Sequence, residues 1–164
     1  VLLVKRKLEP FKEYWAIPGG FVKNNESIED AAKRELREET GVSDVYLEQL
    51  YTFGELKRDP RGRIITVAYY ALINSDKLHL RASTETSGVA WFSLSSLPKL
   101  AFYHEKIVSY AIKRLRWKFE YTTVSFSLLP NKFTMSQLQD LYEIVFNKKF
   151  DKRNFSKSKK ISVS

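Results

Sequence analysis

The chain has 164 residues and contains no cysteine, which excludes disulfide frameworks, thiolate metal sites and cysteine nucleophiles and fits a reducing compartment. No apolar run approaches the ~18 residues that a membrane span needs. The opening Val1–Val4 is too short for the core of a signal peptide, and the basic residues Lys5–Lys7 follow it instead of preceding it. We therefore expect a cytoplasmic protein that does not enter a membrane. Because the chain does not begin with methionine, we also expect residues before Val1.

Charge is distributed unevenly along the chain. Residues 1–100 contain 15 Lys/Arg and 14 Asp/Glu, whereas residues 101–164 contain 13 and 5, which gives net charges of +1 and +8. A balanced first part and a basic second part indicate two units with different partners. The basic unit is suited to a polyanion such as DNA, although a solvated lysine-rich surface would have the same composition.

The first 100 residues alternate strand and helix signals, which favours an α/β fold. Ser27 is a plausible N-cap, Gly41 is placed to end a helix, and Ile28, Ala31, Ala32 and Leu36 lie on one helical stripe between them. Four segments read as strands, the middle two forming a hairpin around a turn at Asp59–Gly62: Val1–Arg6, Val45–Leu56, Arg63–Ile73 and Val89–Phe92.

The pattern changes after Leu100. His104–Lys118 reads as a basic amphipathic helix, and Phe119–Leu129 as a strand-like run. Thr134 or Ser136 is expected to cap a helix through Phe146, and a basic helix is expected to begin near Asp151. We divide the chain into an α/β domain at 1–118 and a basic helical domain at 119–164.

The helix after Ser27 carries a cluster of carboxylates. Glu35 is three residues from Glu38 and four from Glu39, so the three side chains can share one side of the helix. Like charges at this spacing repel each other by a few tenths of a kcal/mol per pair unless a cation lies between them. Mg²⁺ prefers oxygen ligands and takes others from substrate phosphates. The pattern favours a magnesium and diphosphate site over a solvated charge-rich helix.

Neighbouring residues extend this site. Arg34 can reach back to Glu26 and hold the preceding loop, and Gly19-Gly20 allows the backbone to approach the metal, where a main-chain carbonyl could be a ligand.

The stretch from Gly20 to Val42 resembles the signature box of the Nudix hydrolases, which cleave nucleoside diphosphates linked to another group. It matches at every required position: Gly20, Glu26, Arg34-Glu35-Leu36, Glu38-Glu39 and Gly41-Val42. The resemblance implies an α/β/α sandwich with a mixed sheet. It implies the metal ligands Glu35, Glu38, Glu39 and the Gly20 carbonyl for Mg²⁺ (or Mn²⁺), with Glu26 and Arg34 as supports of the loop and helix.

Many Nudix enzymes take a general base or a further metal ligand from a later loop. Glu85 is the one carboxylate in Ser83–Gly88, and its register is shifted from the family's pattern. The resemblance therefore implies catalytic roles for Glu38, Glu39 and Glu85, and a surface position for Glu85 is the alternative.

The end of the chain resembles a second group, the Nudix-related transcriptional regulators. The similar pieces include Trp91–Leu94, Leu97–His104, Phe119–Thr122, Phe133–Gln139 and Asp151–Phe155. In that group a Nudix-like domain senses a small ligand, ADP-ribose or a pentose sugar in characterised members, and a C-terminal winged helix binds operator DNA as a dimer. The resemblance implies a winged-helix-like domain and a homodimer here.

Basic residues near the last expected helix could neutralise DNA phosphates, and we assign DNA binding to Lys152, Arg153, Asn154 and Lys157. A helical lid or dimerisation arm is the alternative. A wing would need a strand pair after this helix, so we expect the domain to be incomplete at Ser164 or to lack the wing.

Two functions follow. The first is Mg²⁺-dependent hydrolysis of ADP-ribose or a related nucleoside diphosphate derivative. The alternative is a ligand-sensing DNA-binding regulator with little or no hydrolase activity.

Overall fold

The computed structural model spans residues 1–164 and describes 1–73, 79–84, 86–130 and 132–160. The chain divides into two compact units, 1–111 and 112–164. The division falls inside one helix, α2 (His104–Tyr121), in which the sequence-based boundary at residue 118 also lies. No helix in these described ranges combines the length and the apolar character that crossing a membrane requires.

One sheet of the N-terminal unit has the strand order β2-β1-β5. Its strands are β1 (Leu2–Arg6), β2 (Trp15–Ala16) and β5 (Thr86–Trp91), and both pairings are antiparallel. A parallel bridge between Trp15 and Leu100 makes the pairing mixed. The strands expected near Val1–Arg6 and Val89–Phe92 are therefore confirmed, and the structure pairs them in one sheet.

The expected hairpin is also present but shorter. Strand β3 (Glu48–Phe53) pairs antiparallel with β4 (Thr66–Tyr70). The connecting loop contains the turn in which the Gly62 N–H donates to the Asp59 carbonyl at 3.3 Å. The hairpin buries Leu50, Phe53 and Ala68 against Ile107 of α2, which places α2 over this pair of strands.

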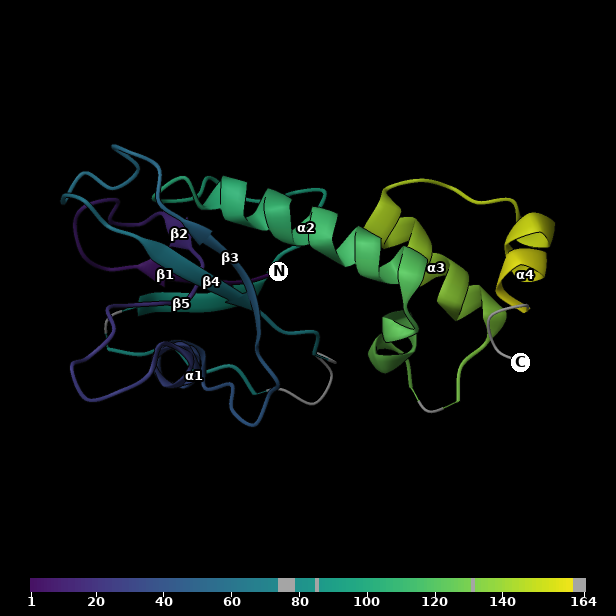
Figure 1. Ribbon diagram of the computed structural model, residues 1–164, viewed down its shortest axis with the longest axis horizontal. Helices are drawn as coiled ribbons and strands as arrows, with labels where there is room; N and C mark the ends of the chain where they lie inside the picture. Colours follow the sequence, from purple (N-terminus) through teal and green to yellow (C-terminus); the bar gives the residue numbers. More distant parts are fainter. Residues whose placement is uncertain (74–78, 85, 131, 161–164) are drawn as a thin grey trace. The chain divides into compact units, whose positions relative to one another are not determined.

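Helix α1 (Ile28–Thr40) begins and ends where its flanking residues predict. The Ser27 hydroxyl accepts from the Asp30 N–H at 3.1 Å, and Gly41 ends the helix with a φ of 76°, which glycine adopts without a Cβ clash. Ala31 is buried, but Ile28 is exposed, so the expected apolar stripe is wrong at its first position. Helix α1 lies against β5, and α1 and the start of α2 cover opposite sides of the strands, as Figure 1 shows. The α/β/α arrangement is confirmed.

The start of α2 is hydrogen-bonded to the segment that leads into the loop before α1, which contains Gly19 and Gly20 and is called the glycine loop below. The Ile17 N–H donates to Nδ1 of His104 at 3.0 Å. Phe102 and Tyr103, just before the helix, adopt φ angles of 53° and 58°, in the left-handed region that non-glycine residues rarely occupy. Such a corner persists where its surroundings hold it, and the hydrogen bond at His104 is one such restraint.

The C-terminal unit consists of the end of α2, the 3-10 helix η2 (Val124–Leu128), α3 (Met135–Phe146) and α4 (Lys152–Lys160). Thr134 caps α3 with a full capping box, and α4 confirms the expected basic helix. The strand expected at Phe119–Leu129 is wrong: this run is the last turn of α2 followed by η2. Its aromatic residues serve a helical core, because Phe119 is buried against Tyr142 with ring centroids 5.0 Å apart.

The His104 anchor generates a stability prediction. Burial, and then the nearby Arg58 charge, lower the pKa of His104 to about 4. Since this value lies below the unfolded value of about 6.5, folding is favoured by neutral His104 above pH 6.5, and that contribution is lost as pH falls from 6.5 to 4. We expect wild type to lose about 2 to 3 kcal/mol more than His104→Asn between pH 7 and pH 4.5, measured by urea unfolding.

The chain offers a matched control in its other histidine, His79, which is exposed. The variant His79→Asn should keep the wild-type pH dependence. If His104→Asn also keeps it, His104 is not the titrating group.

Candidate functional site

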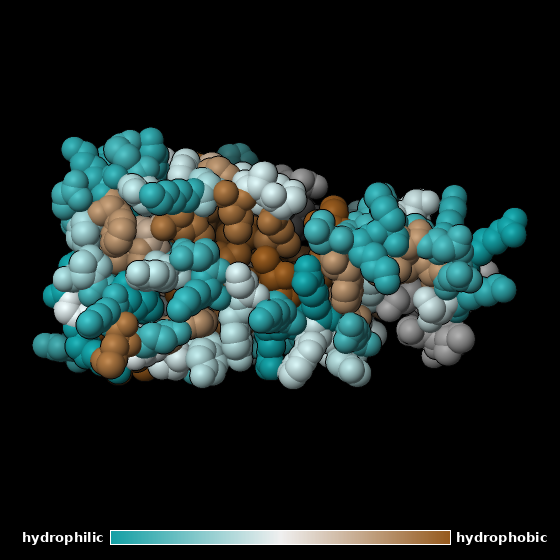
Figure 2. Space-filling model, turned by 90° about the horizontal axis from the view of Figure 1, so that it is seen from above, coloured by the Kyte–Doolittle hydropathy of each residue, from teal (hydrophilic) through white to brown (hydrophobic). Residues whose placement is uncertain are grey.

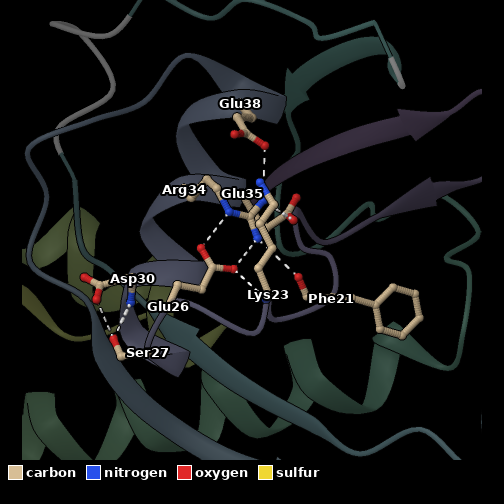
Figure 3. Close-up of polar contacts among 8 residues, drawn as sticks. All are labelled: Phe21, Lys23, Glu26, Ser27, Asp30, Arg34, Glu35 and Glu38. Carbon is tan, nitrogen blue, oxygen red and sulfur yellow. Dashed lines mark hydrogen bonds and ion pairs between the residues drawn. The ribbon is translucent and has the colours of Figure 1, made fainter.

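Arg34 is the centre of the polar site on α1. Its Nε and Nη2 donate to the two carboxylate oxygens of Glu26 at 2.9 and 2.7 Å. Its Nη1 contacts Glu35 at 2.5 Å and Glu38 at 3.1 Å, and its Nη2 also donates to the Phe21 carbonyl at 3.2 Å. Figure 3 shows the guanidinium among these groups. The contact expected between Arg34 and Glu26 is present, and it joins the loop to the helix.

Burial and charge explain why this arrangement holds. The side chains of Arg34 and Glu26 are each 13% exposed, so their bidentate ion pair is screened less than a surface pair would be. The hydrogen bond from Arg34 holds the pKa of Glu26 well below its usual range, at about 2. Glu26 also accepts from the Lys23 N–H at 2.8 Å, so one ionised carboxylate joins Lys23 of the loop to Arg34 of the helix.

The glycine loop lies directly against the carboxylates of α1. A Cβ at Gly20 would overlap the carboxylate of Glu35, so a side chain at this position would displace Glu35 from the loop. The Gly19 N–H donates to Glu39 Oε2 at 2.8 Å. The expected metal ligands Gly20, Glu35, Glu38 and Glu39 therefore come from one loop and the helix next to it.

The donor set matches the chemistry of a hard divalent cation, because it consists of carboxylate oxygens and a nearby main-chain carbonyl. In the described ranges, however, no three acidic or histidine side chains are grouped closely enough to hold a metal ion. The reason is local: Arg34 contacts Glu35 and Glu38, while Glu39 is hydrogen-bonded to Gly19. Glu38 is 49% exposed. Its side chain is therefore accessible to an ion from solvent.

Glu85, which the sequence assigned to catalysis, lies outside the described residues. Sequence reasoning also missed a group of arginines, which comprises Arg6 at the end of β1 and Arg58 and Arg61 in the loop between β3 and β4. It treated this loop only as a turn. The available signal was the density of charge in Lys57–Arg63, which a simple turn does not require.

In the C-terminal unit, Phe155 anchors α4 to the core, where it lies 4% exposed next to Tyr142 with ring centroids 5.3 Å apart. The residues assigned to DNA binding are all exposed on this helix: Lys152, Arg153, Asn154 and Lys157. In Figure 2 hydrophilic side chains cover the end of this unit that carries α4. The unit therefore exposes the basic side chains of α4, while Phe155 of the same helix packs into the aromatic core.

The turn before α4 is held by two side chains of α3. Glu143 accepts from the Phe150 N–H at 3.0 Å and from Gln139 Nε2 at 3.0 Å, and it pairs with Lys149. Gln139 also donates to the Phe150 carbonyl at 2.9 Å. These bonds, led by the one from Lys149, lower the pKa of Glu143 to about 2. The charged carboxylate thus holds the turn that precedes α4.

Comparison with known proteins finds a matching family for each part of the chain. Residues 1–111 match the NUDIX domain family, and residues 125–161 match the NrtR DNA-binding winged helix domain. An ADPR responsive transcriptional repressor NtrR from Acinetobacter baylyi is 40% identical over 159 residues, which cover 94% of this chain and 63% of that protein. The chain thus spans less than two thirds of the length of this relative.

Two further proteins are similar. An ADP-ribose pyrophosphatase from Methanocaldococcus jannaschii is 40% identical over 118 residues, covering 72% of this chain and 67% of the relative. The crystal structure of Shewanella oneidensis NrtR complexed with a 27mer DNA is 34% identical, has a TM-score of 0.79 and covers 99% of this chain and 75% of that one. The NUDIX domain of the same protein complexed with ADP ribose is 38% identical, with a TM-score of 0.66 and coverages of 70% and 77%.

The carboxylate helix, the glycine loop that it contacts and the match over residues 1–111 agree, and the chain belongs to the Nudix family.

Proposed function

We propose that this chain is a DNA-binding transcriptional regulator whose Nudix domain binds ADP-ribose in the cytoplasm. The observation that carries the proposal is the joint presence of a complete Nudix box and a packed unit that presents an exposed basic helix. The similarity to an ADPR responsive transcriptional repressor over 94% of this chain supports it. So does the similarity to Shewanella oneidensis NrtR, whose structures include complexes with ADP ribose and with DNA.

The ligand site would be built on α1 and the glycine loop. The Glu26–Arg34 ion pair would hold the loop, and the carboxylates of Glu35, Glu38 and Glu39 with the Gly20 carbonyl would hold Mg²⁺ or Mn²⁺. A bound cation would neutralise the diphosphate of the ligand. The chain's own residues would then orient that diphosphate against the loop.

Helix α4 would contact the DNA. Winged-helix and helix-turn-helix proteins place one helix in the major groove, and the positive charges of Lys152, Arg153 and Lys157 suit phosphates while Asn154 suits a base edge. Phe155 would keep the helix seated on its unit while the opposite side reads DNA. A homodimer would present two such helices to two half-sites.

A second function, hydrolysis of ADP-ribose, is favoured by one specific observation: Glu35, Glu38 and Glu39 of the box all lie on α1. The similarity to an ADP-ribose pyrophosphatase also supports it. In this reaction water attacks one phosphorus, the bridging P–O bond breaks, and AMP and ribose 5-phosphate leave. Glu38, Glu39 and Glu85 are the proposed catalytic carboxylates, and a regulator that slowly hydrolyses its own effector would need all of them.

DNA binding by α4 can be tested on the full chain. Duplex DNA selected from a random pool serves as the probe, and its affinity is measured by fluorescence anisotropy at several salt concentrations. Arg153→Ala removes a phosphate contact, so we expect weaker binding and a slope of log K against log salt that is smaller in magnitude by about 1. ADP-ribose should change the affinity of the wild type.

The control for charge is Lys12→Ala, which removes one positive charge from the N-terminal unit and should leave the slope unchanged. Selection of no sequence by the wild type at low salt would refute the regulator.

Hydrolysis can be tested through Glu39. Glu39→Gln removes one negative charge while its amide can still accept from the Gly19 N–H. We expect Mg²⁺-dependent release of AMP from ADP-ribose to fall by about 10² or more, since both metal binding and charge neutralisation suffer. The readout is AMP formation followed by chromatography.

Glu29→Gln on the same helix is the matched control, because Glu29 is exposed and pairs only with Lys33 among the contacts described. The Glu29→Gln variant should release AMP from ADP-ribose at the wild-type rate. Equal activity of Glu39→Gln and wild type would exclude the carboxylate box as the hydrolytic centre.

A further inference from the structure

Arg61 is held rigidly at the edge of the Nudix domain. Its Nε and Nη2 donate to the two oxygens of Asp59 at 2.9 and 2.7 Å, and its backbone N–H donates to the same carboxylate at 3.0 Å. The Asp59 side chain is 3% exposed, whereas that of Arg61 is 40% exposed. The hydrogen bond from Arg61 lowers the pKa of Asp59, so the pair stays ionised. A buried carboxylate thus fixes a guanidinium that faces solvent.

Arg6 is held in the same way by carbonyl groups. Its Nε donates to the Pro10 carbonyl at 3.0 Å and its Nη2 to the Leu8 carbonyl at 3.2 Å. Both guanidiniums lie over the ring of Phe102, each with its carbon 4.6 Å from the centroid. In each arginine the Nη1 amino group makes no hydrogen bond to any described residue. Two neighbouring cations therefore keep unused donors.

A third arginine, Arg58, contacts Phe102 as well. Arg58 is buried at 6% exposure, donates to Thr66 Oγ1 and to the Phe102 carbonyl, and leaves its Nε without a partner in the described structure. Burial lowers the pKa of Arg6, and Arg61 lowers it further, while Glu39, Asp59 and Glu9 raise it. Cations that are close to one another and partly removed from water favour the binding of an anion.

The arginines also adjoin the carboxylate box. Arg6 interacts electrostatically with Glu39, and the guanidinium of Arg61 lies 5.3 Å from the ring of Phe21 in the glycine loop. Phe21 is 64% exposed. A ligand that reaches Glu39 is therefore within the electrostatic range of both arginines.

We propose that Arg6 and Arg61, seated together on Phe102, form an anion-binding fork that takes the diphosphate of the ligand through their Nη1 donors. This inference rests on the proposed function and adds a second contact to the same site. Charge-assisted N–H···O bonds from arginine suit phosphate, and guanidiniums already held by Asp59 and by two carbonyls lose little freedom on binding. In this fork the Nη1 groups of Arg6 and Arg61 donate directly to phosphate oxygens, and these bonds do not require a metal ion.

The test measures binding by calorimetry to the full chain in EDTA, with ADP-ribose and inorganic pyrophosphate as separate probes. Without metal, hydrolysis is prevented and the arginine contribution is isolated. We expect Arg6→Gln and Arg61→Gln each to reduce the affinity for both probes about tenfold or more, as the loss of a charged hydrogen bond predicts. Arg63→Gln removes the same charge from the same loop. Among the described residues Arg63 donates hydrogen bonds to the Gly54 and Glu55 carbonyls alone, so this variant should bind both probes like the wild type.

Folding is checked by circular dichroism and thermal melting. Arg6→Gln leaves the Asp59–Arg61 pair intact, and a double variant, Asp59→Asn with Arg61→Gln, removes that pair without leaving a buried charge. Wild-type affinity in the folded arginine variants would overturn the fork, as would an equal loss in Arg63→Gln. Binding of neither probe by the wild type in EDTA would overturn the fork. The proposed ligand is judged separately, by repeating the ADP-ribose titration with Mg²⁺, and absence of binding there would overturn it.

Discussion

The bidentate ion pair between Arg34 and Glu26 is the interaction on which the Nudix site depends. One guanidinium gathers Glu26, Glu35, Glu38 and the Phe21 carbonyl, and so it binds the loop to the helix that follows it. A carboxylate cluster on one helix would repel itself, and a partly buried arginine offsets that repulsion. A cation that binds Glu35 and Glu38 must compete with Arg34 for these carboxylates. Since Arg34 also holds Glu26 and Phe21 of the loop, cation binding and the conformation of the loop depend on the same side chain.

The segment Trp15–Gly20 connects this site with helix α2. The Trp15 carbonyl accepts from the Ala101 N–H at 2.8 Å, the Ile17 N–H donates to His104, and the Gly19 N–H donates to Glu39. Three bonds at alternate residues thus join strand β2, the start of α2 and the carboxylate helix. Helix α2 itself begins in the N-terminal unit and continues into residues of the C-terminal unit.

The C-terminal unit is built on aromatic packing, and Lys152, Arg153 and Lys157 remain exposed on its helix α4. Tyr142 contacts Phe119 and Phe155, and its hydroxyl donates to the Phe119 carbonyl at 2.9 Å within a buried core. Glu143 then sets the turn that starts α4. Lys152, Arg153 and Lys157 of α4 do not belong to this core, which is consistent with a role for their charge in binding a polyanion.

The sequence by itself determined where helices begin and end and which side chains share a helix. Ser27 and Gly41 bound α1, Thr134 caps α3, and the spacing of Glu35, Glu38 and Glu39 placed them on one helix, because capping bonds and helical periodicity involve residues within a few positions of each other. Tertiary structure decided the rest. Phe119–Leu129 has the composition of a strand, yet it lies in a helix and a 3-10 turn because Phe119 is needed in the core of the second unit. The arginine fork depends on Arg6, Arg61 and Phe102, which the fold brings together from separate elements and no sequence spacing could reveal.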